Sequence, residues 1–386
     1  MRKRLLFAAM TGLLVAGCGS SEAPTTQSAP SPGSAASETP SAKPSAPASS
    51  SAAKPDSAPS CPAVADMSTR EKVAQLVVVG VESGAQATTQ LVRDHQVGGL
   101  FIGGNATDLF TGGALKSVQD AADVPVSIAI DDEGGRVQRL DELVGDMPSA
   151  REMAASMTPQ EVRQLALERG KEMAKRGVTV DYAPDLDLTD EPASEAIGDR
   201  SFSTDPATAR RYAKAFGDGL QEAGIQPVIK HFPGHGNASG DSHVGDVTTP
   251  PLPELRKHDL KPFERVGEYG DVGVMVGHLT VPQLTDGQPA SISPAAYRLL
   301  RQDYNFDGPV VTDDLGAMKA ITDRHSLPDA VLLALKAGAD KALWSSGGDV
   351  GPVLDRLEQA ANSGELSAER INASLNRVLS SKDACG

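Results

Sequence analysis

The strongest constraint on the fold is a set of short, almost continuously apolar runs that recur along the chain. Runs of this kind are typical of strands buried on both faces, because a strand with one wet face alternates apolar and polar residues. Eight such runs are present, at residues 75–81, 98–104, 125–131, 178–184, 225–231, 271–278, 308–313 and 341–345. The pattern therefore predicts eight buried strands.

Helical signals lie between these runs. Thr158 to Glu161 form a capping box with Pro159 at the first helical position, and Asp205-Pro206 opens a second helical stretch. Eight strands with helical crossovers are the content of one (β/α)8 barrel, the TIM-barrel fold of the α/β class. We predict such a barrel for residues 61–386. An open doubly wound sheet is the alternative, because counting strands does not show that a sheet closes.

The beginning of the chain has the features of an export signal. Residues 1–4 are basic, and residues 5–15 are apolar but too few to span a bilayer. Residues 15–18, Val-Ala-Gly-Cys, resemble a bacterial lipobox, which is cleaved before its cysteine. We predict a signal peptide at 1–17, lipidation at Cys18, and an extracytoplasmic protein that is lipid-anchored to the cell membrane. A plain secretory signal is the alternative.

The predicted linker covers residues 18–60. After Cys18 this segment is rich in Ser, Ala and Pro, and it contains no Leu, Ile, Val, Phe, Tyr or Trp. A segment with so few apolar side chains to bury cannot offset the entropy of ordering its backbone. We therefore expect a disordered tether between the anchor and the barrel.

The two remaining cysteines, Cys61 and Cys385, stand at the two ends of the predicted domain. In an oxidising compartment they can pair in a disulfide. The pairing requires that the ends of the domain lie side by side, which a closed barrel provides.

The charge of the chain bears on its partners. The formal net charge is −15, although the first four residues contain three basic side chains. An acidic surface repels phosphate backbones, so we expect no nucleic acid partner. A neutral or cationic substrate fits this surface better.

Ionisable residues follow several of the predicted strands. In a barrel the carboxyl ends of all strands meet at one rim, where barrel enzymes hold their catalytic groups. A single residue of this kind is as often a capping group or a solvated loop residue, but the whole set on one rim predicts an active site. The set contains Asp131, Asp185, Lys230, His231, His278, Asp313 and Asp314.

The densest group lies in residues 230–243. Residues 230–236 read Lys-His-Phe-Pro-Gly-His-Gly, and residues 241–243 read Asp-Ser-His. A zinc site with two histidines on one helical face is excluded, because Pro233 and the glycines prevent that helix. Zinc held from a loop by His231, His235 and His243 is the alternative that the spacing leaves open.

Four segments together resemble the signature of family 3 glycoside hydrolases, of the single-domain β-N-acetylglucosaminidase (NagZ-like) type. They are residues 130–139, 197–202, 230–243 and 311–315, and they follow one another in the family's order. The resemblance spans roughly residues 65 to 380. It implies a retaining exo-β-N-acetylglucosaminidase that removes terminal N-acetylglucosamine from peptidoglycan-derived muropeptides, in cell-wall turnover or recycling.

The resemblance also implies roles for individual residues. Asp313 would be the nucleophile and His243, paired with Asp241, the general acid and base. The residues that would hold the sugar are Asp131, Arg139, Arg200, Lys230 and His231. Chemistry supports this division, because retention needs an ionised carboxylate on one face of the anomeric carbon and a proton donor on the other. The mechanism needs neither a metal nor an organic cofactor, so we predict none.

Some choices stay open. Asp314 adjoins Asp313, and the family pattern of a small hydroxyl residue before the nucleophile selects Asp313, leaving Asp314 as a loop anchor. Asp132 stands where glutamine is common, and Met318 lies one position later than the family pattern. We expect a monomer. The alternatives are a β-glucosidase-type family 3 enzyme and a non-catalytic lipoprotein that binds wall sugars. The natural aglycone and the choice of water or phosphate as acceptor are not determined.

Overall fold

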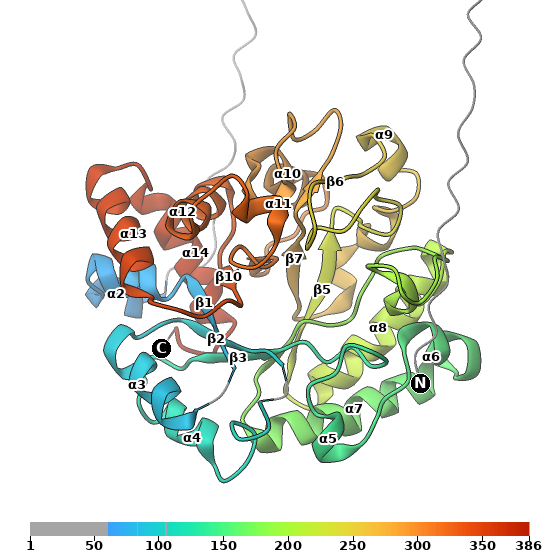
Figure 1. Ribbon diagram of the computed structural model, residues 1–386, viewed down its shortest axis with the longest axis horizontal. Helices are drawn as coiled ribbons and strands as arrows, with labels where there is room; N and C mark the ends of the chain where they lie inside the picture. Colours follow the sequence, from blue (N-terminus) through green and yellow to red (C-terminus); the bar gives the residue numbers. More distant parts are fainter. Residues whose placement is uncertain (1–60, 83, 105, 386) are drawn as a thin grey trace, which may run out of the picture. The chain divides into compact units, whose positions relative to one another are not determined.

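The computed structural model describes residues 61–385 apart from Ser83 and Asn105 (Figure 1). The predictions of the signal peptide, of lipidation at Cys18 and of the linker fall outside the described residues. Within the described part, every helix is too short or too polar to cross a bilayer.

The central element is a sheet of eight parallel strands in the order β10-β1-β2-β3-β4-β5-β7-β9. Each strand coincides with one of the predicted apolar runs, and β5 extends one residue beyond its run. The bounds are β1 Val77–Val81, β2 Gly99–Ile102, β3 Ser127–Ile130, β4 Val180–Asp181, β5 Gln226–Phe232, β7 Gly273–Val276, β9 Val310–Thr312 and β10 Ala342–Trp344.

The two ends of this sheet meet. Val311 of β9 and Lys341, which precedes β10, form a parallel bridge. The amide of Thr312 donates to the carbonyl of Lys341 at 3.1 Å, and the amide of Leu315 donates to that of Leu343 at 2.9 Å. The sheet is therefore a nearly closed barrel. The (β/α)8 prediction is confirmed, and the open-sheet alternative is wrong.

Helices surround the barrel (Figure 1). Thr158 caps α7 in the predicted capping box, and the Asp205 carboxylate accepts the amide of Thr208 at 2.8 Å at the start of α8. The helices are α1 Ala63–Asp66, α2 Thr69–Ala74, α3 Ala85–His95, α4 Ala114–Gln119, α5 Asp141–Val144, α6 Ala150–Ser156, α7 Pro159–Arg176, α8 Pro206–Glu222, α9 Leu252–Leu255, α10 Pro294–Arg298, α11 Lys319–Thr322, α12 Leu327–Ala337, α13 Gly351–Ser363 and α14 Ala368–Ser380.

The crossover between β5 and β7 departs from the regular pattern. It contains the short α9 and two 3-10 turns, Lys261–Phe263 and Val266–Tyr269, where a full helix would stand in an ideal barrel. Before them comes β6, Val247–Thr248, which pairs with β8, Leu279–Thr280, in a separate two-stranded sheet. Further short turns lie at Gly198–Arg200, Ala290–Ile292 and Leu299–Asp303. The segment between β5 and β6 is thus an irregular loop and not a crossover helix.

Apolar side chains fill the interior of the barrel. Phe101 and Tyr182 stack there with ring centroids 5.6 Å apart. The cluster contains Val78, Phe101, Ala129, Val180, Tyr182, Val228, Met275, Val311 and Leu343, and all are buried. This packed interior separates the two ends of the barrel, as is usual for the fold.

The first and last parts of the domain lie together. The structure joins Cys61 and Cys385 in a disulfide whose Cα atoms are 4.6 Å apart, and α1 packs against α14. The amide of Cys61 also donates to the side-chain oxygen of Asn376 in α14 at 3.0 Å. Both ends of the domain are therefore fixed to the last helix.

Candidate active site

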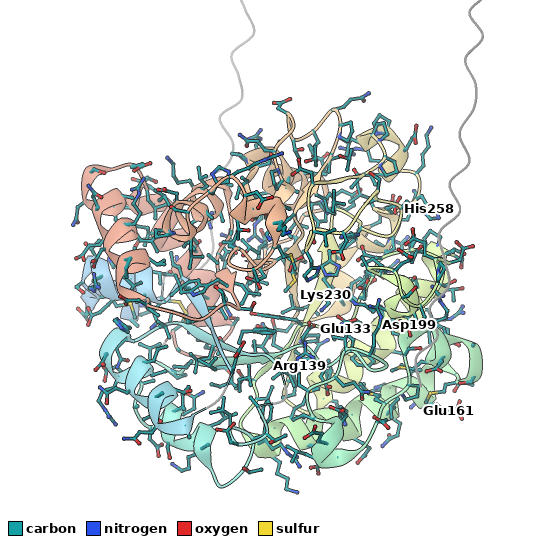
Figure 2. The ribbon with its side chains drawn as sticks, viewed as in Figure 1. Glu133, Arg139, Glu161, Asp199, Lys230 and His258 are labelled. Carbon is teal, nitrogen blue, oxygen red and sulfur yellow. A yellow bond between two sulfur atoms is a disulfide. The ribbon has the colours of Figure 1, made fainter. Side chains whose placement is uncertain are left out.

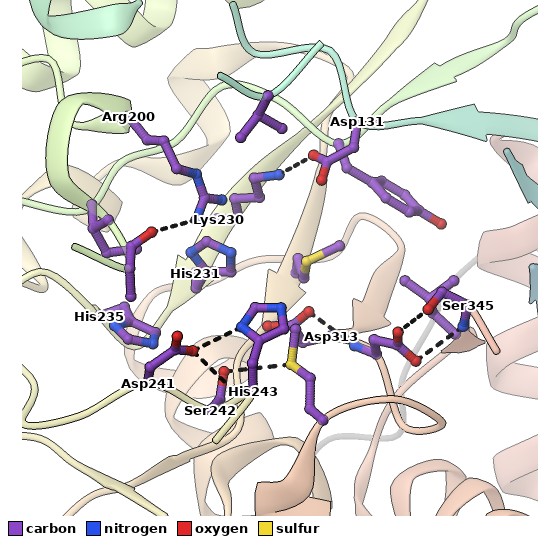
Figure 3. A pocket seen from close by; sticks show the side chains of 18 of the residues that line it. Asp131, Arg200, Lys230, His231, His235, Asp241, Ser242, His243, Asp313 and Ser345 are labelled. Carbon is purple, nitrogen blue, oxygen red and sulfur yellow. Dashed lines mark hydrogen bonds and ion pairs between the residues drawn. The ribbon is translucent and has the colours of Figure 1, made fainter. Parts of the chain in front are cut away.

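The carboxyl ends of the barrel strands surround a cavity of about 390 Å³ (Figure 3). All eight residues that the sequence predicted for catalysis and sugar binding line it. They are Asp131, Arg139, Arg200, Lys230, His231, Asp241, His243 and Asp313. The top of the interior cluster, Phe101, Tyr182, Met275 and Leu343, contributes its apolar lining. The structure thus brings residues from distant parts of the chain into one site.

Asp313 directly follows β9, so the sheet fixes its position. Only 7% of the residue is exposed, and its Oδ1 accepts the amide of Asp314 at 2.9 Å. Burial opposes ionisation, but the positive potential of His231 and His278, the Asp314 amide and Lys230 outweigh it and lower the pKa of Asp313. The carboxylate is therefore ionised at neutral pH.

Asp314 holds the loop that follows. Its Oδ1 accepts the amides of Gly316 at 2.8 Å and Ser345 at 3.0 Å, and Ser345 also donates its hydroxyl to Oδ2. The carbonyl of Asp314 lies 2.8 Å from Nε2 of His278, which must donate to it, and Nδ1 of His278 lies 2.7 Å from the hydroxyl of Ser291. These contacts agree with the predicted anchoring role of Asp314.

A group of cations and carboxylates lies beside the cavity, and Figure 2 labels its members Glu133, Arg139 and Lys230. Nζ of Lys230 contacts Asp131 and lies 2.6 Å from Oε1 of Glu133. Nε and Nη2 of Arg200 each lie 2.8 Å from an oxygen of Glu133, and Nη2 of Arg139 lies 3.8 Å from Asp131. Burial opposes the charge of Glu133, but Arg200 and Lys230 lower its pKa. Burial likewise opposes the charge of Lys230, but Asp131 and Glu133 raise its pKa.

Sequence reasoning assigned no role to Glu133. It lies in the matched segment 130–139, two positions after Asp131, and it is buried. Charge balance was the available signal, because one carboxylate cannot neutralise Arg139, Arg200 and Lys230 together.

His231 is oriented by a buried aspartate that the sequence analysis also missed. Nδ1 of His231 lies 2.6 Å from Oδ2 of Asp187, and Oδ1 of Asp187 accepts the amide of His235 at 2.6 Å. Asp185 in turn accepts the amide of Asp187 at 2.7 Å. The proton on Nδ1 of His231 must therefore face Asp187, which leaves Nε2 for the cavity.

Ligand atoms of Asp185, Asp187 and His231 lie within 4.8 Å of one another, as a metal site would require. The donor set does not fit a cation well. Nδ1 of His231 is already bonded to Asp187, and Nη2 of Arg200 lies 3.5 Å from Oδ2 of Asp185, so a positive charge already faces that oxygen. The zinc alternative needed His235 and His243, and among the described residues neither belongs to this group.

The loop after β5 carries the second catalytic candidate. Nδ1 of His243 lies 2.8 Å from Oδ1 of Asp241, which also accepts the His243 amide at 2.9 Å. Burial raises the pKa of Asp241, but its hydrogen bonds and charge contact with His243 outweigh this and lower it. The side chain of His243 is 64% exposed. Contacts of Ser242 with Met318 and Ala320 hold the loop beside the cavity. The pair thus presents Nε2 of His243 for proton transfer.

The family model described as "Glycosyl hydrolase family 3 N terminal domain" matches residues 68–381. The chain belongs to glycoside hydrolase family 3. The predicted resemblance and the prediction of an enzyme are thereby confirmed, and each of the four matched segments contributes residues to the cavity.

Named relatives of this family 3 chain agree. The beta-hexosaminidase LpqI of Mycobacterium tuberculosis is 50% identical over 324 residues, which cover 82% of this chain and 83% of LpqI. A family 3 glycosyl hydrolase from Mycobacterium smegmatis superposes with a TM-score of 0.80 at 50% identity, over 82% of this chain and 98% of that one. A family 3 β-N-acetylglucosaminidase from Paenibacillus gives a TM-score of 0.76 at 30% identity, over 83% and 63%.

Proposed function

We propose that this family 3 enzyme is a β-hexosaminidase that acts as a retaining exo-β-N-acetylglucosaminidase on peptidoglycan-derived muropeptides. The carrying observation is that one cavity holds a buried, ionised Asp313 and the hydrogen-bonded pair of Asp241 and His243. The relatives named beta-hexosaminidase and β-N-acetylglucosaminidase support the choice of an N-acetylated hexosamine over glucose.

In the first step, the Asp313 carboxylate attacks the anomeric carbon and forms a covalent glycosyl-enzyme. The bond from that carbon to the aglycone oxygen breaks, and Nε2–H of the His243 imidazolium donates its proton to this oxygen. Asp241 stabilises the imidazolium through Nδ1–H. In the second step, neutral His243 accepts a proton from water, whose oxygen displaces Asp313 from the sugar.

The sugar would be held by Asp131, Arg139, Arg200, Lys230 and His231. Their ion pairs and hydrogen bonds fix donors and acceptors before the substrate arrives, so little ordering entropy is lost on binding. Asp131 keeps part of its carboxylate exposed at 22%, which leaves it able to accept sugar hydroxyls. A cavity of about 390 Å³ suits a terminal sugar, which supports exo cleavage.

The loop that carries His243 would move during the cycle. His243 is largely exposed, while a proton donor works best when water is excluded around it. Gly240 in this loop has a φ of +99°, a backbone conformation that residues other than glycine rarely adopt. Closure of the loop over bound substrate would bring His243 to the glycosidic oxygen.

The proposed location is the outer side of the cell membrane, with the protein held there by a lipid at Cys18. The lipobox-like sequence supports this anchor, and the disulfide between Cys61 and Cys385 suits an oxidising compartment. A wall-facing enzyme meets fragments that end in N-acetylglucosamine linked to N-acetylmuramic acid.

The test compares two chromogenic substrates on the full-length protein in detergent, the 4-nitrophenyl N-acetyl-β-glucosaminide and the matching β-glucoside. Strong preference for the first is expected, and preference for the glucoside would overturn the substrate class. Asp313→Asn should abolish activity and covalent trapping without unfolding the protein, whereas the control Asp323→Asn, on an exposed loop, should keep both. Release of free N-acetylglucosamine from purified muropeptides tests the natural substrate, and absence of release would refute it.

A further inference from the structure

A second cavity lies at the opposite end of the barrel from the active site. Its volume is about 490 Å³, and it is lined by residues at the amino ends of β3, β4 and β5 and by the segment 381–383 after α14. Ser127, Thr179 and Gln226 contribute polar groups to it. The apolar interior of the barrel separates this cavity from the site at the carboxyl ends.

Lys341 reaches this end from inside the barrel. The residue precedes β10 and is 6% exposed, and its side chain lies among Val78, Val180 and Val311. Its Nζ donates to the hydroxyl of Ser127 at 3.2 Å. Ser127 itself lines the cavity, so the ammonium group stands directly behind the cavity wall.

Lys382 reaches the same end from the C-terminal segment. Its Nζ donates to the carbonyl of Gly98 at 2.6 Å and to the side-chain oxygen of Gln75 at 3.1 Å. Both acceptors are neutral. Lys382 lines the cavity, and the disulfide three residues later ties this segment to Cys61. The disulfide therefore restrains the segment that carries Lys382 at the amino end of the barrel.

Neither lysine has a counter-ion in the part of the chain that the structure describes. Asp340 adjoins Lys341, but its carboxylate is bound by Arg301 and Arg370 at 2.6 Å each and by Arg377 at 3.5 Å. Asp271 and Asp383 also line the cavity, and both residues are exposed. Two ammonium groups thus share one end of the barrel, and neither forms an ion pair with a carboxylate among the described residues.

The pKa values of both lysines are lowered, which shows that their charged forms are destabilised. Burial lowers the pKa of Lys341 to about 8, and Asp340 offsets this only in part. Burial also lowers the pKa of Lys382 far below its usual value, and the charge of Lys341 lowers it further. A negative ligand near both groups would offset the repulsion between their charges and the cost of burying them.

We propose that this cavity binds a small oxyanion, of the phosphate or carboxylate class, at the ammonium group of Lys382 and the hydroxyl of Ser127, behind which the ammonium group of Lys341 lies. The side-chain amide of Gln226, which also donates to Asp271 at 3.4 Å, would add a further hydrogen bond. Asp271 and Asp383 also line the cavity, and its volume of about 490 Å³ limits the ligand to a small anion. It is distinct from the sugar site in position and in chemistry.

The test is isothermal titration calorimetry of the full-length protein in detergent with sodium phosphate and, separately, sodium acetate. Chloride keeps the ionic strength constant, and saturating N-acetylglucosamine occupies the active site, whose cations would otherwise bind the same anions. Saturable one-to-one binding of at least one anion is expected. Lys382→Met should weaken it about tenfold or more, because one charge-assisted hydrogen bond is lost.

The control is Lys257→Met, which removes an exposed lysine elsewhere and should leave the affinity unchanged. Lys341→Met is the second variant, and its long apolar side chain suits the buried position. A further readout is the pKa of the two lysines by NMR, which must rise when the anion binds. Lack of saturable binding of both anions, or binding that Lys382→Met leaves unchanged, would overturn the proposal. So would binding that N-acetylglucosamine abolishes.

Discussion

Arg200 and Glu133 form a two-pronged ion pair in which Nε and Nη2 of the guanidinium each lie 2.8 Å from a carboxylate oxygen. The same carboxylate lies 2.6 Å from Nζ of Lys230. Glu133 therefore neutralises two of the cations proposed to hold the sugar, although it does not line the cavity itself. It acts on the substrate through Arg200 and Lys230, which makes it a positioning residue.

Glu133→Gln should raise KM more than it lowers kcat, because the change leaves Arg200 and Lys230 without a shared counter-charge and loosens both. Loss of one partner of a buried ion pair also predicts a free energy of unfolding lower by about 3 kcal/mol. Steady-state kinetics, calorimetric binding of N-acetylglucosamine and urea unfolding check these effects. Glu254→Gln, at an exposed position, is the control. An unchanged KM in Glu133→Gln would contradict the positioning role.

The barrel was predictable from sequence because its strands are buried on both faces and leave short apolar runs. The rim residues were predictable for a related reason, since a residue that directly follows a buried strand of a barrel must lie at the rim, as Asp131 and Asp313 do. The irregular crossover between β5 and β7 was not predicted, because its short turns have no strong periodicity.

Residues that act through other residues were beyond the sequence argument. Charge balance called for a second carboxylate such as Glu133, but only the distances to Arg200 and His231 show which groups Glu133 and Asp187 contact. The same holds at the other end of the barrel. Lys341 and Lys382 belong to different elements, and nothing in their local sequence indicates that both ammonium groups lie at the same end of the barrel.

The hydrogen bond between Asp241 and His243 predicts a dependence on the leaving group. Asp241→Asn removes the charge that stabilises the His243 imidazolium, so proton donation to the aglycone weakens. The loss in kcat/KM should be roughly tenfold to a hundredfold larger for substrates with a basic leaving group than for a dinitrophenyl glycoside, which needs no proton. Asp246→Asn is the matched control, because Asp246 lies in the same loop but pairs with Arg324. Equal losses for all leaving groups would contradict the assignment.

The lowered pKa of Asp313 predicts how covalent trapping depends on pH. An unperturbed aspartate titrates near pH 3.9, so Asp313 stays ionised above about pH 4 and loses its charge only below that. Trapping by an activated fluoro-sugar, whose leaving group needs no acid, should therefore be constant from about pH 5 to pH 8. Intact-protein mass spectrometry measures the rate. Asp313→Asn should show no adduct, and a trapping rate that falls with an apparent pKa above 5 would contradict an ionised nucleophile.

The disulfide between Cys61 and Cys385 links positions 324 residues apart and should stabilise the domain chiefly by restricting the unfolded chain. Replacing both cysteines by Ser should lower the free energy of unfolding by about 2–5 kcal/mol, measured in urea without reductant. Glycosidase activity should be unchanged, because the bond lies away from the carboxyl-end cavity. Adding reductant should destabilise the native sequence but not the double variant, which serves as the control. Two free thiols at these positions in the unreduced protein would refute the bond, and equal stability of both proteins would refute its contribution.

Anion binding at Lys382 should weaken together with stability, since the bond fixes the segment that carries this lysine.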